Sequence, residues 1–154
     1  VVMTTILGSC IACCLFDVRA KIGGMNHFLL PLPPDSSPSD YGEAQRYGLY
    51  AMEVLVNEML KAGANRNFMR ARLYGGANLH VGMRSIGTDN ANFAVQFLAA
   101  DGIDLASSDT GGNSARRLDF QPTTGRIRCR KVQDSAAEIP RTPPKPQVGE
   151  IELF

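Results

Sequence analysis

A cysteine and a histidine near the start of the chain are the residues best suited to chemistry. Cys10 follows Leu-Gly-Ser, and His27 follows Gly-Gly-Met-Asn. A free thiol, with a pKa of about 8.5, is only slightly ionised at neutral pH, and a neighbouring imidazole can accept its proton. The pair therefore supplies the nucleophile and the base that nucleophilic catalysis on a carbonyl carbon requires.

These two residues flank a predicted β-hairpin. Residues 11–16 and 22–30 are apolar runs, and the stretch 17–21 separates them. Apolar runs of this length, bounded by glycine and charged turns, fit strands that are buried on both faces. A turn centred near the middle of the separating stretch places Cys10 opposite His27, and the Cβ atoms of opposed residues lie about 4.5–5.5 Å apart. We therefore expect the thiol to meet the imidazole at the open end of the hairpin.

The sequence around the hairpin resembles a known family. The segment LGSCIACCLFD, followed by GGMNHFLLP, closely resembles the signature of the CheD family, the chemoreceptor glutamine deamidases of bacterial chemotaxis. The later segments LYGGANL and DTGGNSARRLDFQPTTGRIRCRKV resemble further blocks of that family, so the resemblance spans about residues 4–132. It implies hydrolysis of selected glutamine side-chain amides on receptor proteins to glutamates, and methyl-ester hydrolysis at the same kind of site.

The resemblance also implies roles for individual residues. It identifies Cys10 with the family's nucleophile, His27 with its general base, and Thr4, six residues before the cysteine, with a third polar residue. In a triad, such a residue fixes the tautomer of the histidine. Thr5 is adjacent, but successive strand residues face opposite sides, so only one threonine can serve. The family spacing favours Thr4.

The chemistry that follows is acyl transfer to water. The thiolate of Cys10 attacks the carboxamide carbon of a glutamine side chain. His27 protonates the departing ammonia and then acts as base while water hydrolyses the thioester. Backbone N–H groups around Gly8, Ser9 and Cys10 are candidates for stabilising the oxyanion, because glycine permits the turn that aims them. Asn26 is a candidate for positioning the substrate, although its amide could instead complete a turn.

The composition gives no electrostatic case for nucleic acid or membrane as a partner. The 154 residues suit one domain with a sizeable core, and the formal net charge is +1. No apolar stretch approaches the roughly 20 residues that cross a bilayer. The first residues lack a basic leader and a cleavage site, so we expect no signal peptide and a cytoplasmic location. Because the chain starts inside an apolar run without methionine, we also expect an upstream segment.

The other reactive side chains have simpler interpretations. Cys13, Cys14 and Cys129 are expected to be small core residues with free thiols, because neighbouring strand residues point to opposite faces and cannot form a bridge. A metal site that adds His80 to the cysteine–histidine pair lacks closely spaced ligands. We therefore predict neither a metal nor a cofactor.

The rest of the chain predicts an α+β fold in a single domain. Two amphipathic helices alternate with short strands, and a hairpin closes on Pro-Thr-Thr-Gly. The expected helices span residues 41–62 and 88–100, and the expected strands span 68–74, 103–107, 115–121 and 126–132.

The family resemblance refines this fold. It implies stacked mixed β-sheets flanked by helices, an α/β/β/α-like arrangement similar to the catalytic domain of deamidating bacterial toxins. We assign residues 1–132 to this domain, and 133–154, which is rich in proline, to a flexible C-terminal tail. The last residues, GEIELF, could add to a sheet edge, and the sequence leaves this open.

Three functional classes remain. The first is a deamidase acting on the cytoplasmic helices of methyl-accepting chemoreceptors. The second, which the resemblance also implies, is a binding and regulatory module for a CheC-type phosphatase. The third is a thiol redox sensor that uses Cys10 and Cys13. The basic strand RIRCRK, residues 126–131, is either a solvated strand face or a docking edge for acidic receptor helices.

Overall fold

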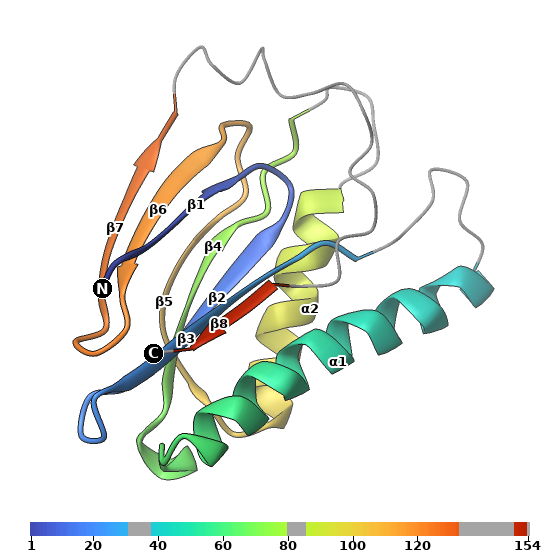
Figure 1. Ribbon diagram of the computed structural model, residues 1–154. Helices are drawn as coiled ribbons and strands as arrows, with labels where there is room; N and C mark the ends of the chain where they lie inside the picture. The colour runs from blue at the N-terminus through green and yellow to red at the C-terminus, as the bar shows by residue number, and fades with distance from the viewer. Residues whose placement is uncertain (31–37, 80–85, 133–149, 154) are drawn as a thin grey trace.

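Two β-sheets and two helices make up the fold of this computed structural model (Figure 1). The structure describes residues 1–30, 38–79, 86–132 and 150–153. Its elements are β1 (Met3–Leu7), β2 (Ile11–Asp17), β3 (Ile22–Phe28), α1 (Pro38–Lys61), a 3-10 turn η1 (Arg66–Phe68), β4 (Arg70–Gly75), α2 (Ile86–Ala100), β5 (Asp104–Thr110), β6 (Arg116–Gln121), β7 (Arg126–Lys131) and β8 (Glu150–Leu153).

The strands form a large and a small sheet. The large sheet has the order β5-β4-β2-β3-β8 and is mixed, because β4 and β5 are parallel while the other neighbours are antiparallel. The small sheet has the order β1-β6-β7 and is antiparallel throughout. The predicted α+β class with stacked sheets is confirmed.

Strand β2 lies at the centre of the large sheet, and every residue in it is buried. Its alternating side chains supply two separate cores. Ile11, Cys13 and Leu15 pack with residues of both helices. The intervening side chains, Ala12, Cys14 and Phe16, pack against residues of the small sheet. The apolar run that the sequence shows at this point is therefore a strand buried on both faces, as predicted.

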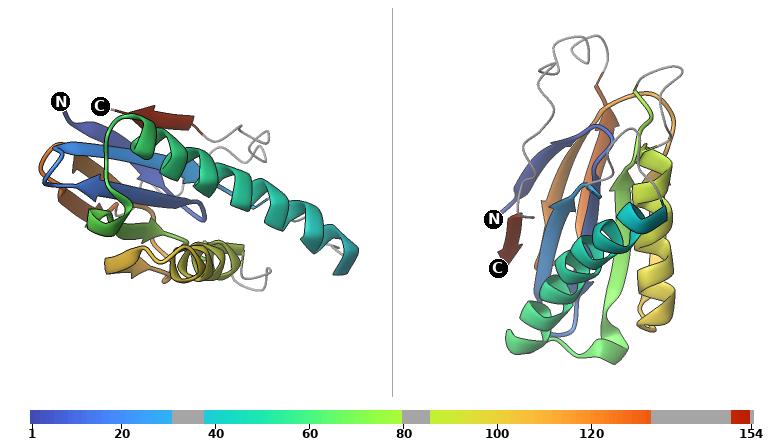
Figure 2. Two further views of the ribbon diagram at one scale, coloured as in Figure 1. Left: turned by 90° about the horizontal axis from the view of Figure 1, so that it is seen from below. Right: turned by 90° about the vertical axis from the view of Figure 1, so that its right-hand side faces the viewer.

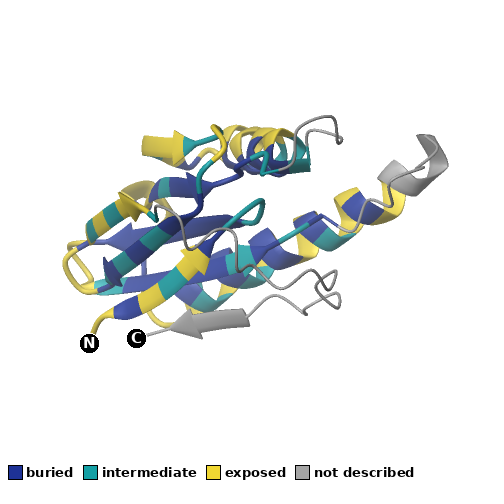
Figure 3. Ribbon diagram, turned by 90° about the horizontal axis from the view of Figure 1, so that it is seen from above, coloured by how far each residue is buried: buried dark blue, intermediate teal, exposed yellow. Residues whose placement is uncertain are grey.

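Both helices lie on the same face of the large sheet (Figure 2). Helix α1 directs Met52, Leu55 and Met59 into this core at helical spacing, and its burial alternates along its length (Figure 3). The chain turns away after α1 at Gly63, whose φ of 109° suits glycine. The predicted helix positions are confirmed to within three residues at each end. No helix in the described ranges combines the length and hydropathy needed to cross a bilayer.

The expected fourth layer is absent from the described residues. The face of the small sheet that points away from the large sheet carries Thr4, Arg117, Asp119 and Arg128, and no described helix covers it. Within the described residues the layers are therefore α/β/β, without the second helical layer of the α/β/β/α-like prediction. The physical reason is that a sheet face of polar residues does not need a helix to shield it from water.

The register of the first hairpin also differs from the prediction. His27 pairs with Ala12, and Cys10 is therefore not directly opposite it. The turn is centred between Arg19 and Ala20, half a residue to one residue later than expected, and the Asp17 carboxylate accepts the N–H groups of these two residues at 3.0 and 3.1 Å. This side-chain turn fixes the last pair of the ladder between Asp17 and the first residue of β3.

The last described strand completes the large sheet. Strand β8 pairs with the stretch of β3 from Gly24 to His27, so the C-terminal residues do add to a sheet edge. The proline-rich stretch 133–149, predicted to be a flexible tail, lies outside the described residues.

Candidate active site

Cys10 lies at the end of β2 that is farthest from the hairpin turn, and its half-buried side chain packs against the core between the sheets. The Gly76 N–H donates to its carbonyl at 2.8 Å and so extends the β2–β4 ladder to this residue. Ala12, two residues on and on the same face, pairs with His27. Cys10 and His27 are thus diagonal neighbours, a relation of about 7–8 Å between Cα atoms that a histidine side chain can span.

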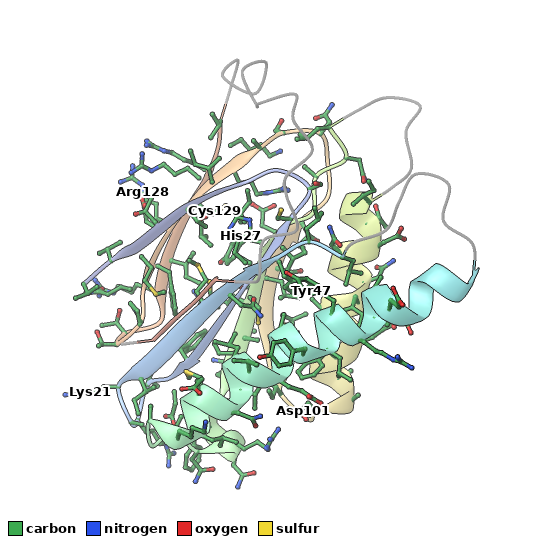
Figure 4. All side chains as sticks on the ribbon, turned by 45° about the vertical axis from the view of Figure 1, so that its right-hand side comes forward. Lys21, His27, Tyr47, Asp101, Arg128 and Cys129 are labelled. Carbon is green, nitrogen blue, oxygen red and sulfur yellow. The ribbon has the colours of Figure 1, made fainter. Side chains whose placement is uncertain are left out.

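His27 faces the small sheet and contacts a threonine there. The Oγ1 atom of Thr5 lies 3.2 Å from Nδ1 of His27, in a partly buried setting. His27 lies well away from the hairpin turn that Lys21 marks (Figure 4). Strand β1 directs Met3, Thr5 and Leu7 inward, so this hydroxyl reaches the imidazole across the gap between the two sheets.

Thr4, the predicted third residue, points the other way. Its hydroxyl donates to the Asp119 carboxylate at 2.8 Å on the exposed face of the small sheet. This contact lowers the pKa of Asp119, and the arginines nearby act in the same direction. The placement of Thr4 against His27 is therefore corrected to Thr5, because β1 pairs with β6 in the register that turns odd-numbered residues inward.

The turn that carries the cysteine is held by its carbonyl groups. Three consecutive carbonyls accept hydrogen bonds from distant segments, and all described peptide bonds are trans. In a planar trans peptide the N–H points opposite to the carbonyl, so fixing the carbonyls of residues 8 and 9 also fixes the N–H directions of residues 9 and 10. The bonds are Ala77 N–H to Gly8 O at 3.0 Å, Asn90 Nδ2–H to Ser9 O at 2.8 Å and Gly76 N–H to Cys10 O at 2.8 Å.

Asn90 is a residue of this site that the sequence analysis missed. It lies on α2 with no exposed surface, donates to Ser9 O, and accepts the Leu30 N–H at 2.9 Å. One amide thus joins the turn beside Cys10 to the chain that follows His27. The only sequence signal was a polar residue within an apolar helical stretch, which is too common to identify such a bridge.

The close approach of two backbones behind the cysteine requires glycine. Gly75 has φ of 105°, and a Cβ atom built on it would lie 2.2 Å from the carbonyl oxygen of Cys10. The glycines of the YGGAN segment therefore shape the back of the cysteine turn.

Asn26 does not belong to the site. As the strand neighbour of His27 it faces the helices, where it is fully buried. Its Oδ1 accepts the Cys13 N–H at 3.1 Å, and its Nδ2 donates to Ala51 O of α1 at 3.3 Å. The role of Asn26 in positioning a substrate is therefore corrected to that of a bridge between β3 and α1.

The four cysteines differ in reactivity, and all are free thiols. Burial raises the pKa of Cys10, and a hydrogen bond from its own backbone N–H acts in the opposite direction. Burial raises the pKa of Cys13 to about 12 and also raises that of Cys14 well above its usual value. Cys13 and Cys14 are thus inert core residues, as predicted, and Cys10 needs a base to form its thiolate.

The redox and metal interpretations find no geometric support. Cys10 faces the small sheet and Cys13 faces the helices, so the two thiols point away from each other, which does not support the redox-sensor alternative. In the described ranges, no three histidine, cysteine, aspartate or glutamate side chains gather as metal ligands. His80 lies outside those ranges.

Comparison with known proteins agrees with the sequence signature. The family model described as CheD chemotactic sensory transduction matches residues 29–131. A probable chemoreceptor glutamine deamidase CheD of Caulobacter vibrioides is 51% identical over 100% of this chain and 84% of its own length. Its counterpart in Zymomonas mobilis is 56% identical over 87% of this chain and 73% of its own length.

The Caulobacter alignment extends over the whole chain, including the cysteine turn and the histidine strand, which the family model leaves out. A further relative of the same description, from Acidiphilium cryptum, is 44% identical over 99% of this chain and 84% of its own length. On this evidence the chain belongs to the CheD family.

Proposed function

We propose that this protein is a chemoreceptor glutamine deamidase that uses Cys10 as nucleophile and His27 as general base. The observation that supports the proposal is that Cys10 and His27 of the large sheet and Thr5 of the small sheet all face the space between the two sheets. The relatives that cover the whole chain are described as having this activity.

Thr5 is the positioning residue of the base. When Nδ1–H of His27 donates to Thr5 Oγ1, the lone pair of the imidazole is on Nε2, which then accepts the proton of the thiol. Because burial raises the pKa of Cys10, the free thiol is mostly protonated at neutral pH, and reaction depends on this transfer.

The thiolate then adds to the carboxamide carbon of the substrate. The C–N bond breaks as the protonated imidazole gives its proton to the leaving nitrogen, and ammonia departs. Water, deprotonated by His27, attacks the thioester and restores the thiol, so the net reaction converts an amide and water into a carboxylate and ammonium.

The oxyanion formed in each half of the reaction needs fixed donors. The N–H groups of Ser9 and Cys10 meet this need, because the carbonyls of Gly8 and Ser9 anchor both peptide planes to distant segments. Donors that are already fixed require no reorganisation when charge develops. The half-buried position of Cys10 also favours a long, exposed side chain such as glutamine over a main-chain amide.

The test is mass spectrometry of a chemoreceptor cytoplasmic domain co-expressed with wild type or with Cys10→Ala. Wild type is expected to raise the mass of particular receptor peptides by about one dalton for each converted amide, because OH replaces NH₂. The variant is expected to fold normally and to leave the peptides unchanged. Deamidation that persists with Cys10→Ala would contradict the mechanism.

Other features implied by the family likeness are part of the same proposal. Methyl-ester hydrolysis would follow the same acyl-enzyme route, with methanol as the leaving group. A CheC-type phosphatase would bind as a regulator, and the receptor's signalling helices would place the activity in the cytoplasm. The stacked sheets with helices on one side also support a likeness to the catalytic domain of deamidating toxins.

A further inference from the structure

The face of the small sheet that no described helix covers carries a line of arginines. Arg126, Arg128 and Arg130 alternate along β7, are all exposed, and are called the arginine track below. The residues between them turn inward. Cys129, for example, packs against the core between the sheets, and Figure 4 shows Arg128 pointing away from it.

The charge of this track is not balanced within the described parts of the chain. Asp119 is the only acidic side chain of β6 and β7, and it already accepts a hydrogen bond from Thr4 and pairs with Arg117 at 3.6 Å. The track arginines act on it from a greater distance: the pKa of Asp119 is lowered first by Thr4, and then by the arginines around it. No ion pair within the described residues involves Arg126, Arg128 or Arg130.

The spacing of the track matches that of an α-helix. Alternate residues of a strand are about 6.6–6.8 Å apart, so three arginines extend over about 13 Å. Carboxylates at positions i, i+4 and i+8 of a helix rise about 6 Å at each step, and so extend over about 12 Å. A helix with acidic residues at this spacing can therefore face all three guanidinium groups at once.

The track also leads toward the catalytic end of the molecule. Arg130 pairs with Arg117, which pairs with Ile6, and the next residues of β1 lead directly into the cysteine turn. Ile6 is 62% exposed beside the track. Exposed aliphatic surface next to arginine is a composition typical of protein interfaces.

We propose that the arginine track is a docking surface for an acidic α-helix of the receptor substrate, separate from the catalytic groups. This inference rests on the proposed deamidase function and adds how the receptor is held. The track binds carboxylates that repeat every four residues along a receptor helix, and the long helical substrate extends from there toward the cysteine turn.

The test is a binding measurement without chemistry. In the Cys10→Ala background, the affinity for a soluble chemoreceptor cytoplasmic fragment is compared between Arg128→Glu/Arg130→Glu and the control Arg46→Glu/Lys61→Glu on α1. Both pairs are exposed and change the net charge equally. The track variant is expected to raise the Kd about tenfold or more at low salt and to weaken its salt dependence, while the control stays near the parent value.

Three results would overturn the docking surface: an unchanged Kd for the track variant, an equal change in the control, or a change seen only when the receptor is embedded in anionic lipid vesicles. The last would assign the track to lipid headgroups. The proposed function is tested by a different measurement. Wild-type protein that binds the receptor fragment but does not deamidate it would contradict the deamidase function and would leave the docking proposal standing. If the track substitutions, made in a chain that keeps Cys10, leave the KM and kcat of deamidation unchanged, docking alone is contradicted.

Discussion

At the scale of single residues, reactivity depends on the side of a strand that each side chain occupies. On β1, Thr5 faces His27 across the gap between the sheets, while Thr4 donates to a carboxylate on the outer face. On β3, His27 faces the same gap, while Asn26 bonds to α1. A slip of one residue in either strand would exchange these roles.

Replacing Thr5 by valine tests the positioning of the base. Thr5→Val keeps the shape of the side chain and removes the oxygen beside Nδ1 of His27. We expect kcat for receptor deamidation to fall by at least about tenfold and the pH–rate profile to change, because the imidazole is no longer held in one tautomer. Steady-state rates measured from pH 6 to about 10 would show both effects.

The matched control is Thr4→Val, which removes the outward hydroxyl of the neighbouring residue. It is expected to keep the kcat and pH profile of wild type, since its only described partner is Asp119 on the outer face. Loss of activity in Thr4→Val with normal activity in Thr5→Val would return the role to Thr4.

The sequence could single out Cys10 and His27 as candidates, but not the threonine that lies against His27. Cys10 and His27 stand within a distinctive motif, and their residue types limit their chemistry. The segment VVMTTIL is apolar at both odd and even positions, so its pattern does not tell which threonine faces inward. Only the pairing of β1 with β6, more than 100 residues later in the chain, decides this.

At the scale of elements, the first hairpin is fixed by one buried carboxylate. Asp17 is 1% exposed and accepts three backbone N–H groups, from Arg19, Ala20 and Asn65. Desolvation alone would raise the pKa of Asp17, but these hydrogen bonds outweigh it and lower the pKa below its usual value of 3.8. The carboxylate thus sets the hairpin turn and ties it to the loop after α1.

The substitution Asp17→Asn tests this anchor. The amide nitrogen of asparagine cannot accept the Asn65 N–H, so the variant is expected to be less stable at pH 7 by about 1–3 kcal/mol. Because the pKa of Asp17 is lowered by folding, its charged form stabilises the fold above about pH 3.8, and this stability is lost as the pH falls through the lower folded value.

Urea unfolding of both proteins at pH 7 and near pH 3 would measure the difference. The gap between them should narrow at the lower pH, where the wild-type carboxylate takes up a proton. A gap that stays constant with pH would mean that the charge of Asp17 does not contribute.

Elements were easier to predict than their alignment. The apolar runs of β2 and β3 and the helical stripe of α1 each follow from local periodicity, and the structure has them where expected. The register of the hairpin could not be predicted, because it depends on the hydrogen bonds of Asp17 within the turn, and nothing in the sequence distinguishes this turn from one centred up to a residue earlier.

At the scale of the whole molecule, the site is assembled from segments that are distant in sequence. Helix α2 contributes through Asn90, which joins the turn beside Cys10 to the end of the histidine strand. The prediction of separate helices and strands gave no means of finding this link. The stacking of the two sheets was likewise implied by the family resemblance and not by the hydrophobic pattern. The pattern of an amphipathic strand shows that one face is buried, but not whether a helix or another sheet covers that face.

A comparison of two buried amides tests the role of α2. Asn90→Leu and Asn26→Leu each remove hydrogen bonds from a fully buried side chain, and each is expected to cost about 2–4 kcal/mol of stability. Only Asn90 touches the cysteine turn, so only its variant should lower kcat per folded molecule, by about tenfold or more.

Rates corrected for the folded fraction, together with the rate of Cys10 alkylation, would separate the two effects. Equal kcat losses in both variants would reduce Asn90 to a stabilising residue. A normal kcat in Asn90→Leu would show that the remaining carbonyl contacts are enough to hold the turn.

The pairing of the first strand with the sixth has a consequence for synthesis. Cys10, His27 and Thr5 all leave the ribosome early, but Thr5 has no place beside the imidazole until Leu118 and its neighbours have been translated. The groups that donate hydrogen bonds to the carbonyls of the cysteine turn, from Gly76 to Asn90, are also translated later than the turn itself. On the proposed mechanism, a nascent chain therefore contains the nucleophile before the contacts that orient its base and its turn can form.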